Sequence, residues 1–169
     1  MQFRHATLYD APRIAALHAL SWQKTYRGIL RDEYLNAEVL RDRLAVWRQR
    51  LTKPVEKQWV WLATDGSKLL GFVCVIGDHD PDWGSLIDNL HIHPDVKGRG
   101  LGASLMREAV EWMKENCAIQ RFYLWVYEDN LPARQFYEKL GGINSSLEVH
   151  ENPGGGSANV LRYSWKNLV

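Results

Sequence analysis

The residues best suited to bind a ligand lie in one glycine-rich segment, Lys97-Gly98-Arg99-Gly100-Leu101-Gly102. A strand-like run at 85–92 precedes it, and apolar residues at helical spacing follow it. Such a turn offers backbone N–H groups and the positive end of a helix dipole to an anion. Lys97 and Arg99 can add positive charge. The segment therefore predicts a phosphate or pyrophosphate site, although a plain flexible loop would use the same glycines.

Other ligands fit these residues less well. A P-loop would end in Gly-Lys-Ser/Thr, and this segment does not. The acidic Glu128 and Asp129 after the next strand suggest a dinucleotide fold, but the glycines run G-x-G-x-G and too little chain follows for a second half. His91 and His93 could share one face of a strand, yet no further ligand stands at a recognised spacing, so we expect no metal.

The elements that must position this segment follow from hydrophobic periodicity and from turn residues. Helices are expected from Asp10 to before Gly28, over 31–51, over 100–116 and from the N-cap Asn130 to Gly141. Strands are expected at 2–6, 58–64, 68–76, 85–92, 121–127, 143–150 and 158–165. This order predicts an α+β fold (a mixed α/β sandwich) in one domain over residues 1–169.

Charge and composition exclude several classes of function. The 21 Lys and Arg against 20 Asp and Glu leave a formal charge of +1 without a basic stripe, which argues against nucleic acid and membrane surfaces as partners. No apolar run is long enough to span a membrane, and the two cysteines, Cys74 and Cys117, read as buried thiols. We expect a cytoplasmic protein.

Two motifs together resemble those of the GNAT superfamily of N-acetyltransferases, in the form common in small bacterial proteins. The segment from Leu90 to Gly102 is similar to the family's acetyl-CoA pyrophosphate motif, Gln/Arg-x-x-Gly-x-Gly/Ala after an apolar-x-apolar-x-Pro strand. The segment from Asn130 to Gly142 is similar to Asn-x-x-Ala-x-x-Phe-Tyr-x-x-x-Gly-Phe, and it departs where Gly142 replaces the usual aromatic residue. With the order of elements, the resemblance extends over nearly the whole chain.

The resemblance implies the fold and the cosubstrate. It implies a central, mostly antiparallel sheet of six to seven strands with one splayed parallel pair, at 85–92 and 121–127, and about four flanking helices. The pantetheine arm of acetyl-CoA would enter between the splayed strands. The residues implied to bind acetyl-CoA are Leu90, His91, Ile92, Lys97, Gly98, Arg99, Gly100, Leu101, Gly102, Asn130, Ala133 and Tyr137.

The activity that the resemblance implies is direct transfer of an acetyl group to the primary amine of a small molecule. Tyr137 would be the general acid, although packing in the core would also explain an aromatic residue there. Asp88 is the expected general base, with His91 and Glu33 as alternatives, and a water chain could replace all three. Trp22, Tyr26 and Glu33 are expected to line the acceptor pocket.

Two other functions and one assembly stay open. The acceptor could be a peptide or a protein, or the domain could be a regulatory module that binds acyl-CoA without turnover. Retention of Tyr137 favours catalysis. A homodimer is possible, because a sheet edge left unpaired would favour one.

Overall fold

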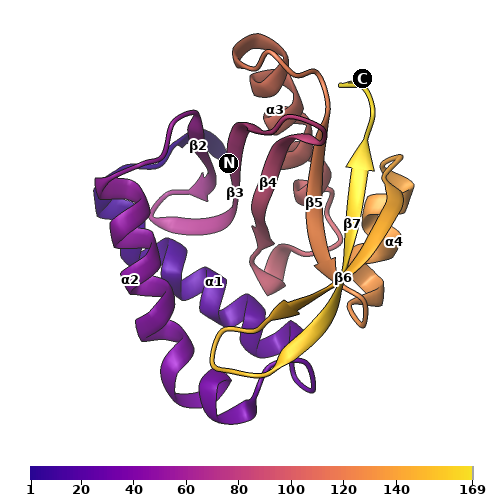
Figure 1. Ribbon diagram of the computed structural model, residues 1–169. Coiled ribbons are helices and arrows are strands. Elements are labelled where there is room, and N and C mark those ends of the chain that lie inside the picture. Colours follow the sequence, from indigo (N-terminus) through magenta and orange to yellow (C-terminus); the bar gives the residue numbers. More distant parts are fainter. Residues whose placement is uncertain (169) are drawn as a thin grey trace.

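The computed structural model describes residues 1 to 168 and contains one seven-stranded sheet, with strand order β1-β2-β3-β4-β5-β7-β6 (Figure 1). The only parallel neighbours among the described strands are β4 and β5. The predicted fold class, strand count and parallel pair are confirmed. The strands are β1 (Gln2–His5), β2 (Gln58–Asp65), β3 (Lys68–Asp80), β4 (Gly84–Ile92), β5 (Phe122–Tyr127), β6 (Ile143–Glu151) and β7 (Ser157–Trp165).

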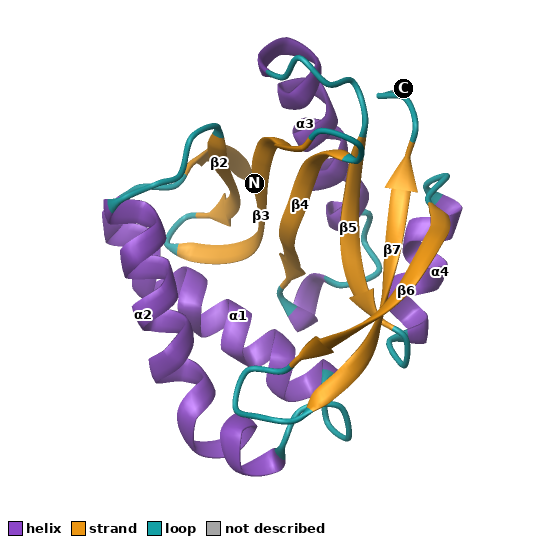
Figure 2. Ribbon diagram, in the orientation of Figure 1, coloured by secondary structure: helices purple, strands orange, loops and turns teal. Residues whose placement is uncertain are grey.

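Four α-helices cover the two faces of the sheet (Figure 2). Helices α1 (Ala11–Thr25) and α2 (Val39–Thr52) pack on one face, where Leu17 and Trp47 are buried with Phe72. Helices α3 (Leu101–Asn116) and α4 (Leu131–Lys139) lie on the other face, where Leu105 packs in one cluster with Val73. The sheet therefore has a helix layer on each side, as the resemblance implied.

The second predicted helical region, over 31–51, is present as helix over 32–52. The sequence did not indicate that Tyr34–Glu38 forms a wider π-helical turn before α2. Tyr34 is buried in this turn, and its hydroxyl donates a hydrogen bond to the Asp42 carboxylate in α2. A π-helical turn has nearly the same hydrophobic periodicity as an α-helix over so few residues, which explains why it was predicted as part of the helix.

A β-bulge in β4 separates the parallel strands. Asn89 lies opposite Cys74 and Ile87 lies opposite Val75, so Asp88 has no partner in β3. Pairing between β4 and β5 is confined to Ser85 and Leu86, just before the bulge. Because a bulge bends its strand and increases the twist, β4 and β5 diverge beyond it (Figure 1). The predicted splayed pair thus has a structural cause at Asp88.

A buried carboxylate fixes the start of α1. Asp10 is 1% exposed and accepts hydrogen bonds from Arg4 Nη2 at 2.7 Å, Arg13 Nε at 2.6 Å and the Thr7 backbone N–H at 2.7 Å. Burial alone would raise the pKa of this carboxyl, but the hydrogen bonds from Arg4, Thr7 and Arg13 outweigh it and hold the pKa well below its usual range.

We expect Asp10→Asn to lower the free energy of unfolding by about 2 kcal/mol at pH 7, because a neutral amide replaces the buried carboxylate that accepts charge-assisted hydrogen bonds from the partly exposed Arg4 and Arg13. A carboxyl with a depressed folded-state pKa stabilises the protein above its unfolded pKa of about 3.9, and this stabilisation is lost as the pH falls through the folded value. Urea unfolding should therefore show a wild-type advantage that shrinks below about pH 4. The exposed control Asp82→Asn should stay within about 0.5 kcal/mol of wild type; an equal effect of both variants would refute the role of Asp10.

Candidate active site

The edge of β4 beyond the bulge carries backbone donors that no strand uses. The N–H of His93 donates to the Leu70 carbonyl of β3 at 2.7 Å. Because successive N–H groups of a strand point to opposite edges, the N–H groups of Leu90 and Ile92 point away from β3, toward the diverging β5. These donors can pair with an extended ligand that lies between the strands, or with a carbonyl oxygen.

The glycine loop that follows β4 has the backbone conformation of an anion site. Gly98 and Gly100 have φ values of +76° and +81°, and a Cβ at either position would meet nothing within 4 Å. Glycine is needed there for the conformation and not for packing. Gly102 has a different role, since its Cβ would lie 3.2 Å from the Phe136 ring of α4, so its missing side chain lets α3 and α4 approach.

The basic residues of this loop are accessible to a ligand. Lys97 and Arg99 are exposed beside the N-terminus of α3, whereas Leu101 turns into the core. The charge of Lys97 also reaches His91, whose pKa it helps to lower. The loop therefore brings backbone donors, a helix N-terminus and two cations to one place, which fits a pyrophosphate.

Tyr137 and Asn130 lie at the open end of the diverging strands. Asn130 caps α4, as predicted, and its Oδ1 accepts from the Ala133 N–H at 3.4 Å. Tyr137 is partly exposed, and burial raises the pKa of its phenol to about 12. This value lies above the ordinary ~10, and it keeps the phenol protonated at neutral pH, as a proton donor requires.

Two further tyrosines, Tyr26 and Tyr127, lie at this end of the site. The rings of Tyr26 and Tyr127 are 4.8 Å apart at 79°. Burial raises the pKa of Tyr26, and the nearby Tyr137 and Tyr127 add to the shift. Three predicted residues thus lie close together: Tyr26 just after α1, Asn130 just before α4 and Tyr137 in α4.

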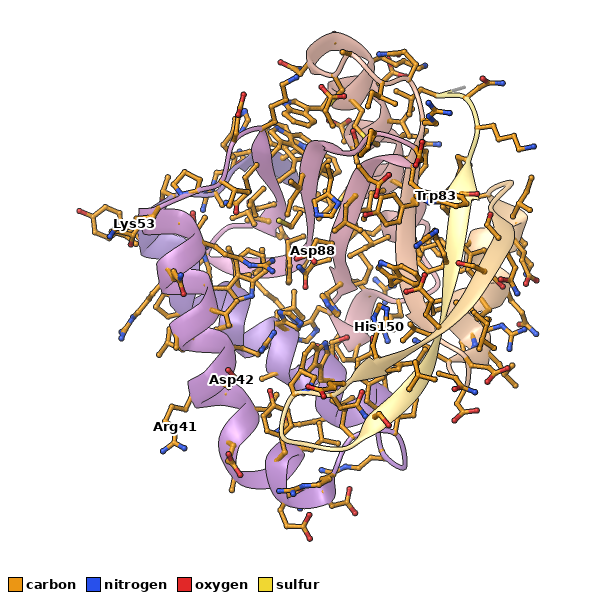
Figure 3. The ribbon with its side chains drawn as sticks, viewed as in Figure 1. Arg41, Asp42, Lys53, Trp83, Asp88 and His150 are labelled. Carbon is orange, nitrogen blue, oxygen red and sulfur yellow. The ribbon has the colours of Figure 1, made fainter. Side chains whose placement is uncertain are left out.

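The predicted base Asp88 lies at the other end of the site, between α2 and the sheet (Figure 3). Its Oδ2 accepts from Arg50 of α2 and from Asn89 Nδ2 at 2.5 Å. The structure gives no hydrogen bond to Oδ1 from residues 1 to 168, so one oxygen of Asp88 can accept a proton.

His91 belongs to a pair of histidines that sequence reasoning did not recognise. Its Nδ1 lies 3.0 Å from Ser21 Oγ, and its ring is 4.4 Å from that of His18 in α1. Burial, with smaller contributions from the charges of Lys97 and Arg43, lowers the pKa of His91 to about 3. A group with this pKa accepts protons poorly near pH 7, which argues against His91 as the general base.

Two arginines of α2 also face this region. The Arg43 guanidinium lies 4.5 Å from the Trp22 ring centroid, and that of Arg50 lies 5.3 Å from Trp47. The sequence contained a signal for them, since positions 43, 47 and 50 fall on one face of a helix. The predicted Trp22 therefore lies in this region, whereas Glu33 is exposed on the connection before α2.

The tip of the β6–β7 hairpin is docked on the connection between α1 and α2 (Figure 1). Tyr127 Oη donates to Asn152 Oδ1 at 3.0 Å, and Asn152 Nδ2 donates to the Ile29 carbonyl at 3.3 Å. Gly154 lies directly on the Tyr34 ring, which a Cβ there would overlap. The glycine-rich loop thus closes one side of the site.

A separate cavity of about 490 Å³ lies between α3, α4 and the end of β7, near Met106, Leu140 and Trp165. None of the predicted site residues lines it. Within residues 1 to 168 there is no group of three or more His, Cys, Asp or Glu side chains that could hold a metal ion. No helix in this part of the chain is long and apolar enough to cross a membrane.

A family model described as the acetyltransferase (GNAT) family matches residues 14–142, more than half of the chain. The chain belongs to the GNAT family. It is accordingly an N-acetyltransferase, and acetyl-CoA is its cosubstrate. The resemblance inferred from the two motifs is confirmed.

Three known proteins illustrate the similarity. A probable N-acetyltransferase of Mycobacterium tuberculosis is 29% identical over 140 residues, 82% of this chain and 78% of that protein. The L-amino acid N-acetyltransferase AaaT of Escherichia coli is 28% identical over 139 residues, 82% of this chain and 80% of that protein. The structure of YncA from Salmonella typhimurium with acetyl-CoA has a TM-score of 0.69 at 16% identity, covering 100% of this chain and 94% of that one.

The departure from the second GNAT motif, Gly142, has a structural explanation. A Cβ at this position would lie 2.6 Å from Cζ2 of Trp165 in β7. The Trp165 ring stacks on Phe122 at 4.5 Å, and its Nε1 donates to the Leu140 carbonyl at 2.8 Å. An aromatic ring from β7 therefore lies against the position where GNAT proteins usually carry an aromatic residue.

Proposed function

We propose that this GNAT enzyme acetylates the primary amine of a small molecule and not that of a folded protein. The observation that carries the proposal is the docked hairpin, in which Asn152 joins Tyr127 to Ile29 and Gly154 contacts Tyr34. A bridge across this side of the site restricts the width available to a polypeptide. The relative named as an L-amino acid N-acetyltransferase also favours a small acceptor.

The proposed reaction is direct attack of the neutral amine on the thioester carbonyl. The N–H groups of Leu90 and Ile92 donate to the carbonyl oxygen as it gains negative charge. The new C–N bond forms, the C–S bond breaks, and the leaving thiolate takes the proton of the Tyr137 hydroxyl. The nitrogen loses its extra proton to a base or to water, and the Tyr137 phenolate regains a proton from solvent. The loop at Gly98 and Gly100, with Lys97 and Arg99, holds the pyrophosphate.

The acceptor binds, in this proposal, on the α1–α2 side of the diverging strands. Trp22 and Tyr26 are partly exposed aromatic side chains on α1 and just after its C-terminal end, and they pack on His18 and Tyr127 respectively. Glu33 is exposed on the adjoining connection, where it can attract a cationic amine before binding.

Asp88 is the proposed general base, since its Oδ1 is available and the bulge turns it toward the acceptor side. We expect Asp88→Asn to lower kcat by at least ~100-fold at neutral pH, with partial recovery as the pH rises and the amine deprotonates in solution. Initial rates between pH 6 and pH 10 would measure this. The exposed Asp129→Asn serves as a control. If kcat falls by less than about threefold at every pH, Asp88 is not the general base and water accepts the proton.

The test of the function combines binding with turnover. Calorimetric titration should show selective binding of acetyl-CoA over NAD and ATP. Thiol release should then occur with small primary amines and not with unstructured peptides or proteins at the same amine concentration. Faster turnover with a peptide N-terminus or a lysine in a folded protein would overturn the choice of a small acceptor.

We also propose that the enzyme is a cytoplasmic homodimer that associates through β6. This strand ends the sheet order, and it exposes Ile143, Leu147 and Val149 by 54%, 52% and 65%. An unpaired edge with exposed apolar side chains favours association. Light scattering should give twice the monomer mass for the wild type and a smaller mass for Val149→Lys. A wild-type protein that stays monomeric at high concentration would refute the dimer.

A further inference from the structure

Helix α2 turns two arginines toward the protein instead of toward solvent. Arg43, Trp47 and Arg50 are spaced i, i+4 and i+7, so they share one face, and Trp47 is completely buried on it. Arg41, two residues before Arg43, points away from the molecule (Figure 3). Charges on an inward helix face are costly unless a partner compensates them.

The two arginines differ in their partners. Arg50 is paired with Asp88, a carboxylate from a different element. Arg43 has a contact to its own neighbour in sequence, from Nη2 to Asp42 Oδ2 at 2.9 Å, and that same oxygen accepts from the Tyr34 hydroxyl. This contact uses one of the five N–H donors of the guanidinium, so the single bond to Asp42 leaves most of its hydrogen-bonding capacity unused.

Donors of Arg43 are left without a partner. Its side chain is 13% exposed, its Nε is buried without a hydrogen bond, and no residue in 1 to 168 accepts a hydrogen bond from its Nη1. A guanidinium presents parallel donors that match a planar, bidentate acceptor. Stacking on Trp22 at 4.5 Å fixes the plane of the group.

The charge of Arg43 acts on the acceptor side of the site. Burial is the main cause of the lowered pKa values of His91 in β4 and His18 in α1, and the charge of Arg43 adds to both shifts. Burial raises the pKa of Tyr127 in β5, and the charge of Arg43 opposes that rise. Lys97, Arg43 and Arg50 are the cations that act on the two histidines, while Asp88 is paired with Arg50 and Asp42 with Arg43. An anionic group beside the Arg43 guanidinium would meet its positive charge directly.

We infer that Arg43 binds a carboxylate of the acceptor, so that the substrate class is amines that also carry a carboxylate, such as amino acids. The inference rests on the proposed small-molecule acetyltransferase function. The carboxylate completes the hydrogen bonds of the buried guanidinium, while the amine is left for the thioester. A phosphonate on the acceptor would offer related chemistry, and the experiment separates the two.

The experiment compares acceptors that differ in this one group. The panel contains the L-amino acids and ω-amino acids of increasing length, each beside its amide, its decarboxylated amine and its aminophosphonate. Thiol release from acetyl-CoA gives kcat and KM for each. We expect the best acid to exceed its amide and its decarboxylated amine at least tenfold in kcat/KM, and to exceed the aminophosphonate as well.

Variants assign the discrimination to Arg43. Arg43→Gln should raise KM for the best acid at least tenfold and leave the rate with its amide unchanged, so that the preference for the acid disappears. Arg43→Lys should restore part of it, since the charge returns without the planar pair of donors. The control Arg41→Gln, on the outer face of the same helix, should keep the full preference. Calorimetric titration of the acid into the enzyme saturated with coenzyme A should show the same order of affinities.

The outcomes separate this inference from the function on which it rests. If amides or decarboxylated amines are acetylated as well as acids, or if Arg43→Gln keeps the preference, Arg43 is not the anchor and the acetyltransferase function stands. If the aminophosphonate is the preferred acceptor, the group that Arg43 binds is a phosphonate and not a carboxylate. If no member of the panel is acetylated although acetyl-CoA binds, the small-molecule function itself fails. Unchanged melting temperatures and acetyl-CoA affinities in Arg43→Gln would exclude loss of the fold as the cause.

Discussion

Tyr137→Phe should lower kcat by about 100-fold or more and change the dissociation constant of acetyl-CoA by less than about threefold. The substitution keeps the ring that packs beside Phe136, 5.2 Å away, and removes only the hydroxyl that protonates the thiolate. Because the hydroxyl stabilises the transition state and not the bound acetyl-CoA, kcat should fall and KM for acetyl-CoA should stay near its wild-type value. Steady-state kinetics and calorimetry would measure the two quantities.

The pH dependence of the wild-type rate is a second test of Tyr137 as the general acid. Its pKa is raised to about 12, so the phenol stays protonated, and its ionisation should cause no loss of activity below about pH 11. Tyr163→Phe is the matched control, since its ring lies 6.1 Å from that of Tyr137 and its hydroxyl donates to Glu138. Equal activity of Tyr137→Phe and wild type would remove Tyr137 from the mechanism.

Gly100→Val should weaken the binding of acetyl-CoA by at least tenfold. A side chain at φ +81° costs about 1–2 kcal/mol, and a β-branched one costs more, so the loop must change its conformation. The N–H groups before α3 would then point away from the pyrophosphate. Calorimetry would give the dissociation constant, where a loss of 1.4 kcal/mol corresponds to a factor of ten.

The chain supplies a close control for this strain. Gly28, in the connection after α1, has φ +82° and, like Gly100, nothing within 4 Å of an added Cβ. Gly28→Val should therefore cost a similar amount of stability and leave the affinity for acetyl-CoA unchanged. Equal weakening by both variants would mean that general destabilisation, and not the anion site, explains the result at Gly100.

Much of the fold could be predicted because its signals are local. The apolar run at 121–127 became β5 at 122–127, and the N-cap Asn130 began α4 as expected. The end of β3 could not be predicted in this way. The strand was expected to stop at 76 and continues to Asp80, where Asp78 accepts from the backbone N–H groups of Ala118 and Ile119. A polar stretch held by residues 40 positions away looks like a loop in the sequence.

The residues of the candidate site also differ in whether their signals are local. The glycine loop, Asn130 and Tyr137 carry motifs, so their approach to one another could be expected. The bulge at Asp88 and the inward face of Arg43 depend on register and on helix packing between distant segments. Such features leave only weak traces in one sequence, as the missed spacing of positions 43, 47 and 50 illustrates.

The docked hairpin has a consequence for the order in which this enzyme assembles. The hydrogen bond from Asn152 to Ile29 joins residues 123 positions apart, whereas both acetyl-CoA motifs end by Gly142. Contacts of such large sequence separation form late, because the entropy of a long chain segment must be lost first. During synthesis both motifs leave the ribosome before the hairpin that docks on Ile29. If the hairpin limits the acceptor as proposed, the wall beside the amine is the last part of the active site to form.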